Sequence, residues 1–330
     1  MAAEPVSSTR REMIARLLGL GALGTATGAL GLWLRSRSRR PEAAGAVSFH
    51  KNFTVPADPA RPELVIARGD RPRELVQKAL DPLGGIRRFV ARGDVVVVKP
   101  NMAWDRGPEL AANTNPEVVG EVVRMCREAG AGRVIVTDVS THDARSAYQR
   151  SGIAAAARAD GAEVIFPDER KFREVNLQGE TLTDWPVFEP FLDADKVINL
   201  PIAKHHSLTG ATLGMKNWYG ILGGQRHRLH QRIHESLADL ASFMRPTLTI
   251  LDAYRVLIRN GPVGGSTADV ELRKTLVAGT DPVAVDAWAA WTFWAIDPPR
   301  MRYLRLAEDR GLGKMDLQKV RTLTLDAEGG

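Results

Sequence analysis

The stretch VVVVKPN at residues 95–101 indicates the fold class of the chain. Its four consecutive valines form a short β-branched run without polar alternation, which is typical of a strand buried on both faces of a parallel sheet. Similar runs recur along the chain at residues 64–67, 133–137, 163–166, 196–200, 247–251 and 275–278. We therefore expect a mostly parallel sheet covered on both faces.

Helix-like segments separate these strand-like runs, at residues 71–80, 116–129, 144–158, 229–243, 283–294 and 299–310. Asn115-Pro116 and Asp281-Pro282 each place a capping residue before a proline in the first helical turn. The alternation of strand and helix predicts an α/β fold with right-handed crossovers. The mixed stretch 167–190 is predicted to form a β-hairpin, near a point where the domain could divide into two lobes.

Charge and cysteine content exclude several classes of function. The chain of 330 residues has 45 basic and 39 acidic residues, a formal net charge of +6. Residues 1–46 hold seven of the basic and three of the acidic residues, leaving 38 and 36 in the remainder. A nearly neutral body predicts no nucleic-acid partner. The single cysteine, Cys126, excludes a Cys-ligated iron–sulfur cluster or Cys₄ zinc site within this chain.

The N-terminal segment 1–46 has the features of a targeting signal. Arg10-Arg11 precedes the uncharged run 17–34, an order that resembles a twin-arginine export signal and predicts export through the twin-arginine translocase. Ala44-Gly45-Ala46 fits a cleavage site, but 18 uncharged residues could also span a bilayer as an uncleaved anchor. We assign residues 47–62 to a linker and 63–330 to the α/β domain, and expect an exported, periplasmic or extracytoplasmic location.

Polar side chains follow the predicted strands at the edge where open α/β sheets bind ligands. This edge is expected to gather a lysine, an amide and two carboxylates, beneath a loop rich in cations and hydroxyls. The residues concerned are Lys99, Asn101, Asp138 and Asp252 at the strand ends, and Lys204, His206, Thr209, Lys216 and Asn217 in the loop.

These residue types suggest three kinds of role. Ammonium, amide and hydroxyl groups suit an anion, with Gly264 and Gly265 in a glycine-rich loop that could close over it or be a plain turn. A divalent metal could be held by Asp138, His206 and Asp252. The catalytic candidates are His206, Lys216 and His230. His227, His230 and His234 have helical spacing, but the interleaved arginines oppose a cation.

Several of these motifs resemble the family catalogued as domain of unknown function 362, over roughly residues 63–325. The matching positions are Lys99-Pro100-Asn101, Asn115-Pro116, Asp138, Asn199-Leu200-Pro201, Lys204, His206, Thr209, Lys216-Asn217, His230, Asp252, Gly261-Pro262, Gly264-Gly265 and residues 281–286. The resemblance favours His206 over the adjacent His205, and it singles out His230. It implies an exported or redox-associated protein, although many members carry ferredoxin-like cysteine clusters that this chain lacks. Ile202 and His205 also depart from the lysine and threonine usual at those positions.

Three functions fit these observations. The leading hypothesis is an exported binding or redox-accessory protein that holds an anionic ligand or metal-containing cofactor at the strand ends. The second is an enzyme acting on a carboxylate or phosphate substrate, with a histidine as acid or base and Lys216 contacting the oxyanion. The third is a membrane-tethered scaffold for a ferredoxin-like redox partner.

Overall fold

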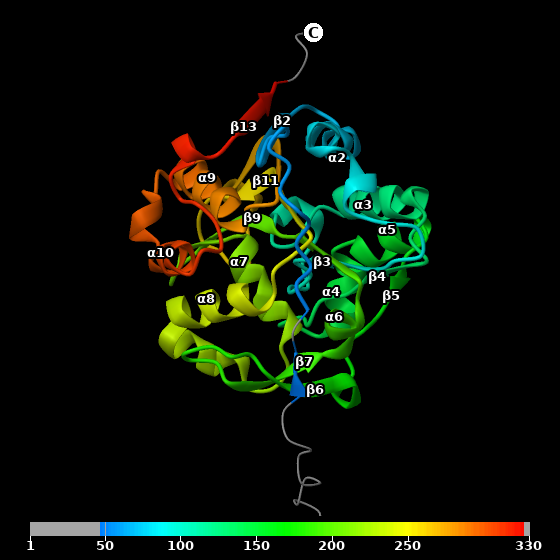
Figure 1. Ribbon diagram of the computed structural model, residues 1–330, viewed down its shortest axis with the longest axis vertical. Helices are drawn as coiled ribbons and strands as arrows, with labels where there is room; N and C mark the ends of the chain where they lie inside the picture. Colours follow the sequence, from blue (N-terminus) through cyan, green and yellow to red (C-terminus); the bar gives the residue numbers. More distant parts are fainter. Residues whose placement is uncertain (1–46, 50, 327–330) are drawn as a thin grey trace, which may run out of the picture. The chain divides into compact units, whose positions relative to one another are not determined.

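A mostly parallel sheet organises the domain, as the valine-rich runs predict. In the computed structural model, which describes residues 47–49 and 51–326, the strand order is β13-β2-β12-β11-β8-β3-β4-β5, with β9 beside β11 and β10 beside β9 (Figure 1). The strands are β2 (Leu64–Arg68), β3 (Val95–Pro100), β4 (Arg133–Val136), β5 (Glu163–Val164), β8 (Lys196–Leu200), β9 (Ile202–His206), β10 (Gly210–Thr212), β11 (Leu248–Leu257), β12 (Val270–Gly279) and β13 (Thr322–Leu325). Within this order only β12 runs antiparallel to its neighbours.

Helices cover both faces of the sheet, which confirms an α/β fold. Figure 1 shows α2, α3 and α5 on one side and α9 and α10 on the other. The helices are α2 (Pro72–Leu80), α3 (Pro116–Ala129), α4 (Ala144–Arg150), α5 (Ile153–Ala159), α6 (Glu189–Asp193), α7 (Gly214–Asn217), α8 (Ile233–Phe243), α9 (Pro282–Trp294) and α10 (Arg302–Asp309). Short 3₁₀ segments are η1 (Asp81–Leu83), η2 (Ile86–Arg88), η3 (Pro108–Leu110), η4 (Glu169–Lys171), η5 (Trp218–Ile221), η6 (Arg226–Arg232), η7 (Thr267–Asp269), η8 (Pro298–Arg300) and η9 (Leu317–Lys319).

The valine run of β3 divides its side chains between two hydrophobic cores. Val96 and Val98 pack in the core beneath α2, α3 and α5. Val97 points to the opposite face and packs in a separate core with Val197 and Trp218. A strand buried on both faces needs apolar residues at every position, so the continuous valine run indicates that both faces of β3 are buried.

The stretch 167–190 forms the predicted hairpin, in which β6 (Phe172–Asn176) pairs antiparallel with β7 (Asp184–Phe188). The segment assigned to the linker adds β1 (Val47–Ser48), which pairs parallel with β6. Val187 of the hairpin packs in the same core as Val97 of the main sheet. The described residues belong to one compact unit, so a division into two lobes is not observed.

Several element boundaries differ from the sequence prediction. The helix expected at 144–158 is divided at Gly152, whose φ of 75° ends the helical path of α4. The helix expected at 229–243 begins only at Ile233, because the preceding residues form the 3₁₀ segment η6. Strand β11 continues to Leu257 through an irregularity between Ala253 and Arg255, since its second half pairs with β9. Asp252 therefore lies within a strand and not after it.

None of the helices described is long and apolar enough to cross a bilayer. The predicted export signal or anchor at residues 1–46 lies outside the described residues.

Candidate functional site

A cavity of about 170 Å³ opens at the carboxyl ends of β3 and β4, where the sequence predicts a site. Strands β9 and β10, helix α7 and the 3₁₀ segments η5 and η6 supply further polar side chains of its lining. Eight of the predicted site residues line it together: Lys99, Asn101, Asp138, Lys204, His206, Lys216, Asn217 and His230. The expected convergence thus occurs for most of the residues, because the parallel strands end at one edge of the sheet.

The floor of the cavity is a buried ion pair. The Lys99 ammonium lies 2.7 Å from Oδ1 of Asp138, and it also donates to the carbonyl of Pro100 at 3.0 Å. The other Asp138 oxygen accepts the backbone N–H of Met102 at 2.7 Å. Burial lowers the pKa of Lys99, and the Asp138 carboxylate opposes that effect. Each charge therefore has a close partner, which a buried pair requires.

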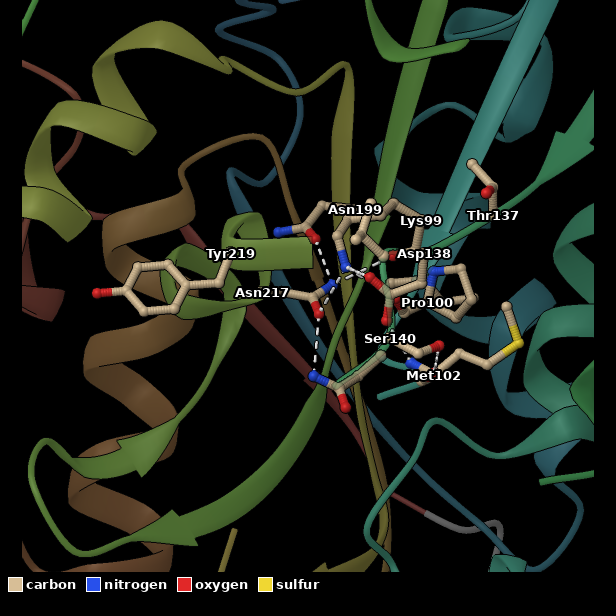
Figure 2. Close-up of polar contacts among 12 residues, drawn as sticks. Lys99, Pro100, Met102, Thr137, Asp138, Ser140, Asn199, Asn217 and Tyr219 are labelled. Atoms are coloured by element: carbon tan, nitrogen blue, oxygen red, sulfur yellow. Dashed lines mark hydrogen bonds and ion pairs between the residues drawn. The ribbon is translucent and has the colours of Figure 1, made fainter. Parts of the chain in front are cut away.

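An amide network fixes the side chains around this pair (Figure 2). Asn217 donates from Nδ2 to Oδ1 of Asn199 at 2.9 Å and to the carbonyl of Lys99 at 3.1 Å. Its Oδ1 accepts from Lys99 Nζ and from Asn101 Nδ2, each at 3.1 Å. Asn199 in turn donates to the carbonyl of Gly214 at 2.9 Å. The amide of Asn217 uses both protons and both lone pairs, so its orientation is determined.

Glycine at position 220 allows the backbone after α7 to approach the ion pair. A Cβ atom there would lie 1.8 Å from Oδ1 of Asp138 and 2.6 Å from Nζ of Lys99. Any larger residue would displace one of these groups. The sequence motif Trp218-Tyr219-Gly220 therefore ends in a residue that the site requires.

Lys204 forms a second buried cation beside the floor. Its ammonium donates to Oδ1 of Asn101 at 2.9 Å and to the carbonyl of Ala112 at 2.5 Å. Burial lowers its pKa well below the usual value; Asp138 offsets this in part, and the ammonium of Lys216 adds to it. Neutral oxygen partners satisfy its hydrogen bonds but leave its charge without an adjacent carboxylate.

Lys216 has no such partner. Its side chain is 7% exposed, and its ammonium lies 4.4 Å from the centre of the Tyr219 ring. Burial lowers its pKa to about 8, with no hydrogen bond or nearby carboxylate from the described residues to oppose the effect. Figure 2 shows the Tyr219 ring directed away from the amide network.

The start of α7 holds Lys216 in this position. Asp286 of α9 is fully buried and accepts the backbone N–H groups of Gly214 at 2.7 Å and Met215 at 3.0 Å. Burial raises the pKa of Asp286 to about 7, while the two N–H groups lower it. Asp286 thus anchors the helix that carries Lys216 and Asn217.

The two histidines of the cavity have different hydrogen-bonding roles. Nδ1 of His206 accepts the backbone N–H of Leu208 at 3.1 Å, which leaves the ring proton on Nε2. Burial, reinforced by the nearby Lys216 charge, lowers its pKa to about 3. Nδ1 of the exposed His230 lies 3.3 Å from the carbonyl of His227, so there the proton lies on Nδ1 and Nε2 is the acceptor. The rings are stacked, with their centres 6.4 Å apart.

Four predicted residues lie outside the cavity lining: Thr209, Gly264, Gly265 and Asp252. The Thr209 hydroxyl donates to the carbonyl of Ala211 at 2.8 Å, and the carbonyl of Gly264 accepts from Arg106 at 3.2 Å. Asp252 accepts the backbone N–H groups of Asn115 at 2.7 Å and Tyr254 at 2.9 Å, because β11 continues past it. It anchors the start of α3 and does not reach the cavity.

The expected metal site is therefore not assembled from Asp138, His206 and Asp252. In the described part of the chain no three histidine, cysteine or carboxylate side chains are grouped closely enough to hold a metal. The cavity lining has four cationic side chains (Lys99, Lys204, Lys216 and Arg226) and one carboxylate, Asp138, a formal balance of +3 with neutral histidines. This donor set does not fit a divalent cation.

Sequence reasoning missed several residues of the lining, among them Arg226, Thr212, Tyr219 and Trp104. The guanidinium of Arg226 donates to the carbonyls of Val139 at 2.6 Å and Ser140 at 2.7 Å. The Thr212 hydroxyl is buried without a hydrogen-bond partner in the described structure. The composition of residues 199–220 contained a signal for Thr212 and Tyr219, and Arg226 is one of the arginines that accompany the histidine run 227–234.

Comparisons with known proteins find similar sequences and structures. A thylakoid-associated protein of Synechocystis sp. is 29% identical over 248 residues, which cover 71% of this chain and 73% of that protein. Among solved structures, the lactate racemase apoprotein of Thermoanaerobacterium thermosaccharolyticum aligns over 72% of this chain and 58% of its own, with a TM-score of 0.42 and 11% identity. A Thermotoga maritima protein aligns over 74% and 60%, with a TM-score of 0.34 and 14% identity.

The match to a protein family covers the part of the chain that builds the cavity. Residues 96–291 match the domain of unknown function 362, from the valine run of β3 to α9. This range includes each lysine and histidine of the cavity, and it confirms the resemblance that the motifs carry. The chain therefore belongs to the domain of unknown function 362 family.

Proposed function

We propose that this protein binds a small anion bearing a carboxylate or phosphate group in the cavity at the strand ends. The observation that carries the proposal is the Lys216 ammonium, which lies in the lining of the cavity without a hydrogen-bond or ion-pair partner among the described residues. An ammonium that faces a cavity without a counter-ion favours the binding of an anion. An anion in the cavity would supply the missing partner.

The other open groups of the cavity suit the same ligand. His206 presents a proton on Nε2, and the unpartnered hydroxyl of Thr212 can donate a further hydrogen bond. Trp104 and Tyr219 offer aromatic surface to an apolar part of the ligand. A volume of about 170 Å³ restricts the ligand to a small molecule.

Binding should be measured by titration calorimetry of the full chain with inorganic phosphate and with small mono- and dicarboxylates. We expect saturable binding of one of these anions, and a loss of that binding in Lys216→Met. Lys171→Met is the matched control, because Lys171 is an exposed lysine outside the cavity. A full chain that binds none of these anions, or a Lys216→Met variant that binds as well as Lys171→Met, would contradict the proposal.

An enzyme acting on a carboxylate or phosphate substrate is the second candidate. It is favoured by an amine whose pKa is lowered to about 8, in the same cavity as the Nε2 proton of His206 and the Nε2 lone pair of His230. A substrate screen should find an activity that falls in both His206→Ala and Lys216→Ala. An activity that survives both changes would reject these roles.

Export and a redox-accessory or scaffold role remain proposals for the whole chain. Arg10-Arg11 before the uncharged run 17–34 supports export by the twin-arginine translocase, and the thylakoid association of the Synechocystis relative is compatible with a membrane-associated setting. Fractionation of cells should place the wild-type protein outside the cytoplasm. The double variant Arg10→Lys with Arg11→Lys should instead remain in the cytoplasm. Co-purification of a ferredoxin-like protein with the full chain would support a redox partner, and its consistent absence would count against one.

A further inference from the structure

A second cavity, of about 340 Å³, lies on a different part of the domain. Its walls are the end of the β6–β7 hairpin, the 3₁₀ segment η6 and the first turn of α8. It shares no lining residue with the first cavity. We propose that this second cavity binds the phosphate group of a small organic phosphate.

The walls of the second cavity are held by contacts that do not involve a ligand. Asp239 of α8 is fully buried, and it accepts the backbone N–H groups of Thr181 at 2.8 Å and Leu182 at 2.9 Å. Arg310 compensates its charge at 2.8 Å. Trp185 of β7 donates from Nε1 to the carbonyl of Gly223 at 3.0 Å. The hairpin is therefore fixed against α8 before any ligand binds, which lowers the entropic cost of binding.

Two hydroxyl groups of this lining have no partner. The Ser236 side chain is 1% exposed, and its Oγ makes no hydrogen bond with the described residues. The buried Oγ1 of Thr181 is likewise without a partner in this part of the structure. A hydroxyl removed from water without a hydrogen bond costs on the order of 1–3 kcal/mol. Both residues belong to the lining of the cavity, and each hydroxyl would turn toward a bound oxyanion to donate to it.

The charge at this cavity favours an anion. The exposed residues Arg228 and Arg232 line it, and within the described residues neither forms an ion pair with a carboxylate. Asp184 is the one acidic residue in the lining, which gives a formal balance of +1. In addition, α8 begins at Ile233 without a capping side chain, so the N–H groups of its first turn add to the positive potential.

Phosphate fits these groups better than a carboxylate does. A guanidinium presents N–H donors in a planar fork that matches two oxygens of a phosphate, and a phosphate has a third oxygen for the hydroxyls. The apolar surface of Leu182, Trp185 and Leu229 lies in the same cavity. A volume twice that of the first cavity leaves room for an organic group against this surface.

Phenyl phosphate is a suitable probe because it combines a phosphate with a ring that can lie on the apolar wall. Titration calorimetry should use the full chain carrying Lys216→Met, which weakens anion binding at the first cavity. The result for the second cavity then does not depend on whether the first cavity binds an anion. We expect saturable binding of one equivalent. Arg232→Gln should weaken it about tenfold or more, as expected for the loss of a charge-assisted hydrogen bond.

Two further variants make the result specific. Arg158→Gln removes an exposed arginine outside both cavities and should bind as the background does. Ser236→Ala should weaken binding several-fold while leaving the thermal midpoint unchanged or higher, because an unpartnered buried hydroxyl is removed. The proposal is overturned if the Lys216→Met protein shows no saturable binding, or if Arg232→Gln binds phenyl phosphate as tightly as Arg158→Gln.

Discussion

Two groups of polar side chains meet in the first cavity, and they differ in how fully they are satisfied. We call Lys99, Asp138, Asn101, Asn199 and Asn217 the closed network, because they bond mainly to one another. We call Lys216, Thr212 and His206 the open wall. Within the described structure the ammonium of Lys216 and the hydroxyl of Thr212 make no hydrogen bond, and the Nε2 proton of His206 is free to donate.

This difference separates structural from ligand-binding polar residues more clearly than burial does. Lys99 and Lys216 are both buried lysines, so their exposure alone does not distinguish them. Lys99 has a carboxylate at 2.7 Å, and its presence is explained by the fold itself. The Lys216 ammonium has no hydrogen-bond or ion-pair partner within the described chain, so it can bind an anion that enters the cavity. Each prediction below tests one side of this contrast.

The largest effect is expected when the closed network is broken. Asp138→Ala removes the carboxylate and leaves the Lys99 ammonium buried without its ion-pair partner. The free energy of unfolding should fall by about 3–5 kcal/mol, as for other broken buried pairs. Urea denaturation followed by circular dichroism measures this change. The double variant with Lys99→Met should recover part of the loss, because it removes the unpaired charge.

A loss below about 1 kcal/mol in Asp138→Ala would show that the network does not depend on its ion pair. The closed network would then be no more structural than the open wall, and the contrast between them would fail.

A change in the open wall should act on binding and not on stability. Lys216→Met keeps the length of the side chain and removes a charge that the described residues do not compensate. The free energy of unfolding should stay the same or rise, whereas affinity for the bound anion should fall at least about tenfold. Calorimetry and urea denaturation on the same preparations give both values. A loss of several kcal/mol in stability would instead make Lys216 a structural residue.

The site residues that the sequence could predict are those whose positions follow from the geometry of the parallel sheet alone. Lys99 lies at the end of β3 and Asp138 follows β4, and because these strands are parallel their carboxyl ends meet at one edge. Lys204, His206 and Lys216 follow β8 within a short segment, which limits how far from that edge they can lie. The fold class and these five residues could therefore be predicted without any knowledge of side-chain contacts.

The positions of other residues depend on irregular backbone, which no periodic pattern in the sequence indicates. Asp252 was expected at a strand end, but β11 continues beside β9 through an irregular register, and the carboxylate bonds to Asn115 and Tyr254. Arg226 lies in a 3₁₀ segment whose sequence resembles an ordinary helix start. Such positions are fixed by long-range packing, which a local pattern of residues does not contain.

The pH dependence of stability should distinguish the open wall from the rest of the protein. Burial lowers the pKa of Lys216 to about 8, below the value of about 10.4 for an unfolded lysine. A lowered lysine pKa contributes stability that is present above the unfolded pKa and is lost as pH falls through the folded pKa. Without anion, wild-type protein should therefore gain stability relative to Lys216→Met between pH 8 and 10, by on the order of 1 kcal/mol.

Saturating anion should abolish this gain, because a bound negative charge raises the pKa of Lys216 and couples binding to proton uptake near pH 8. The same stability series with and without the anion measures the effect. If the two pH profiles coincide, the bound anion does not touch Lys216, and the open wall loses its proposed ligand.

The smallest expected effect concerns the protonation of His206. Burial and the Lys216 charge lower its pKa to about 3, so its ring should stay neutral, with the proton on Nε2, from pH 8 down to pH 5. Nitrogen-15 spectra, with His206→Gln to assign the resonances, report this tautomer directly. Anion binding should raise the pKa, because a negative charge beside Nε2 favours the imidazolium, and Lys216→Met should raise it in the free protein by removing the adjacent cation. A His206 ring that titrates near its ordinary value in the free wild-type protein would mean that water already fills this wall, and that its donors are not held open for a ligand.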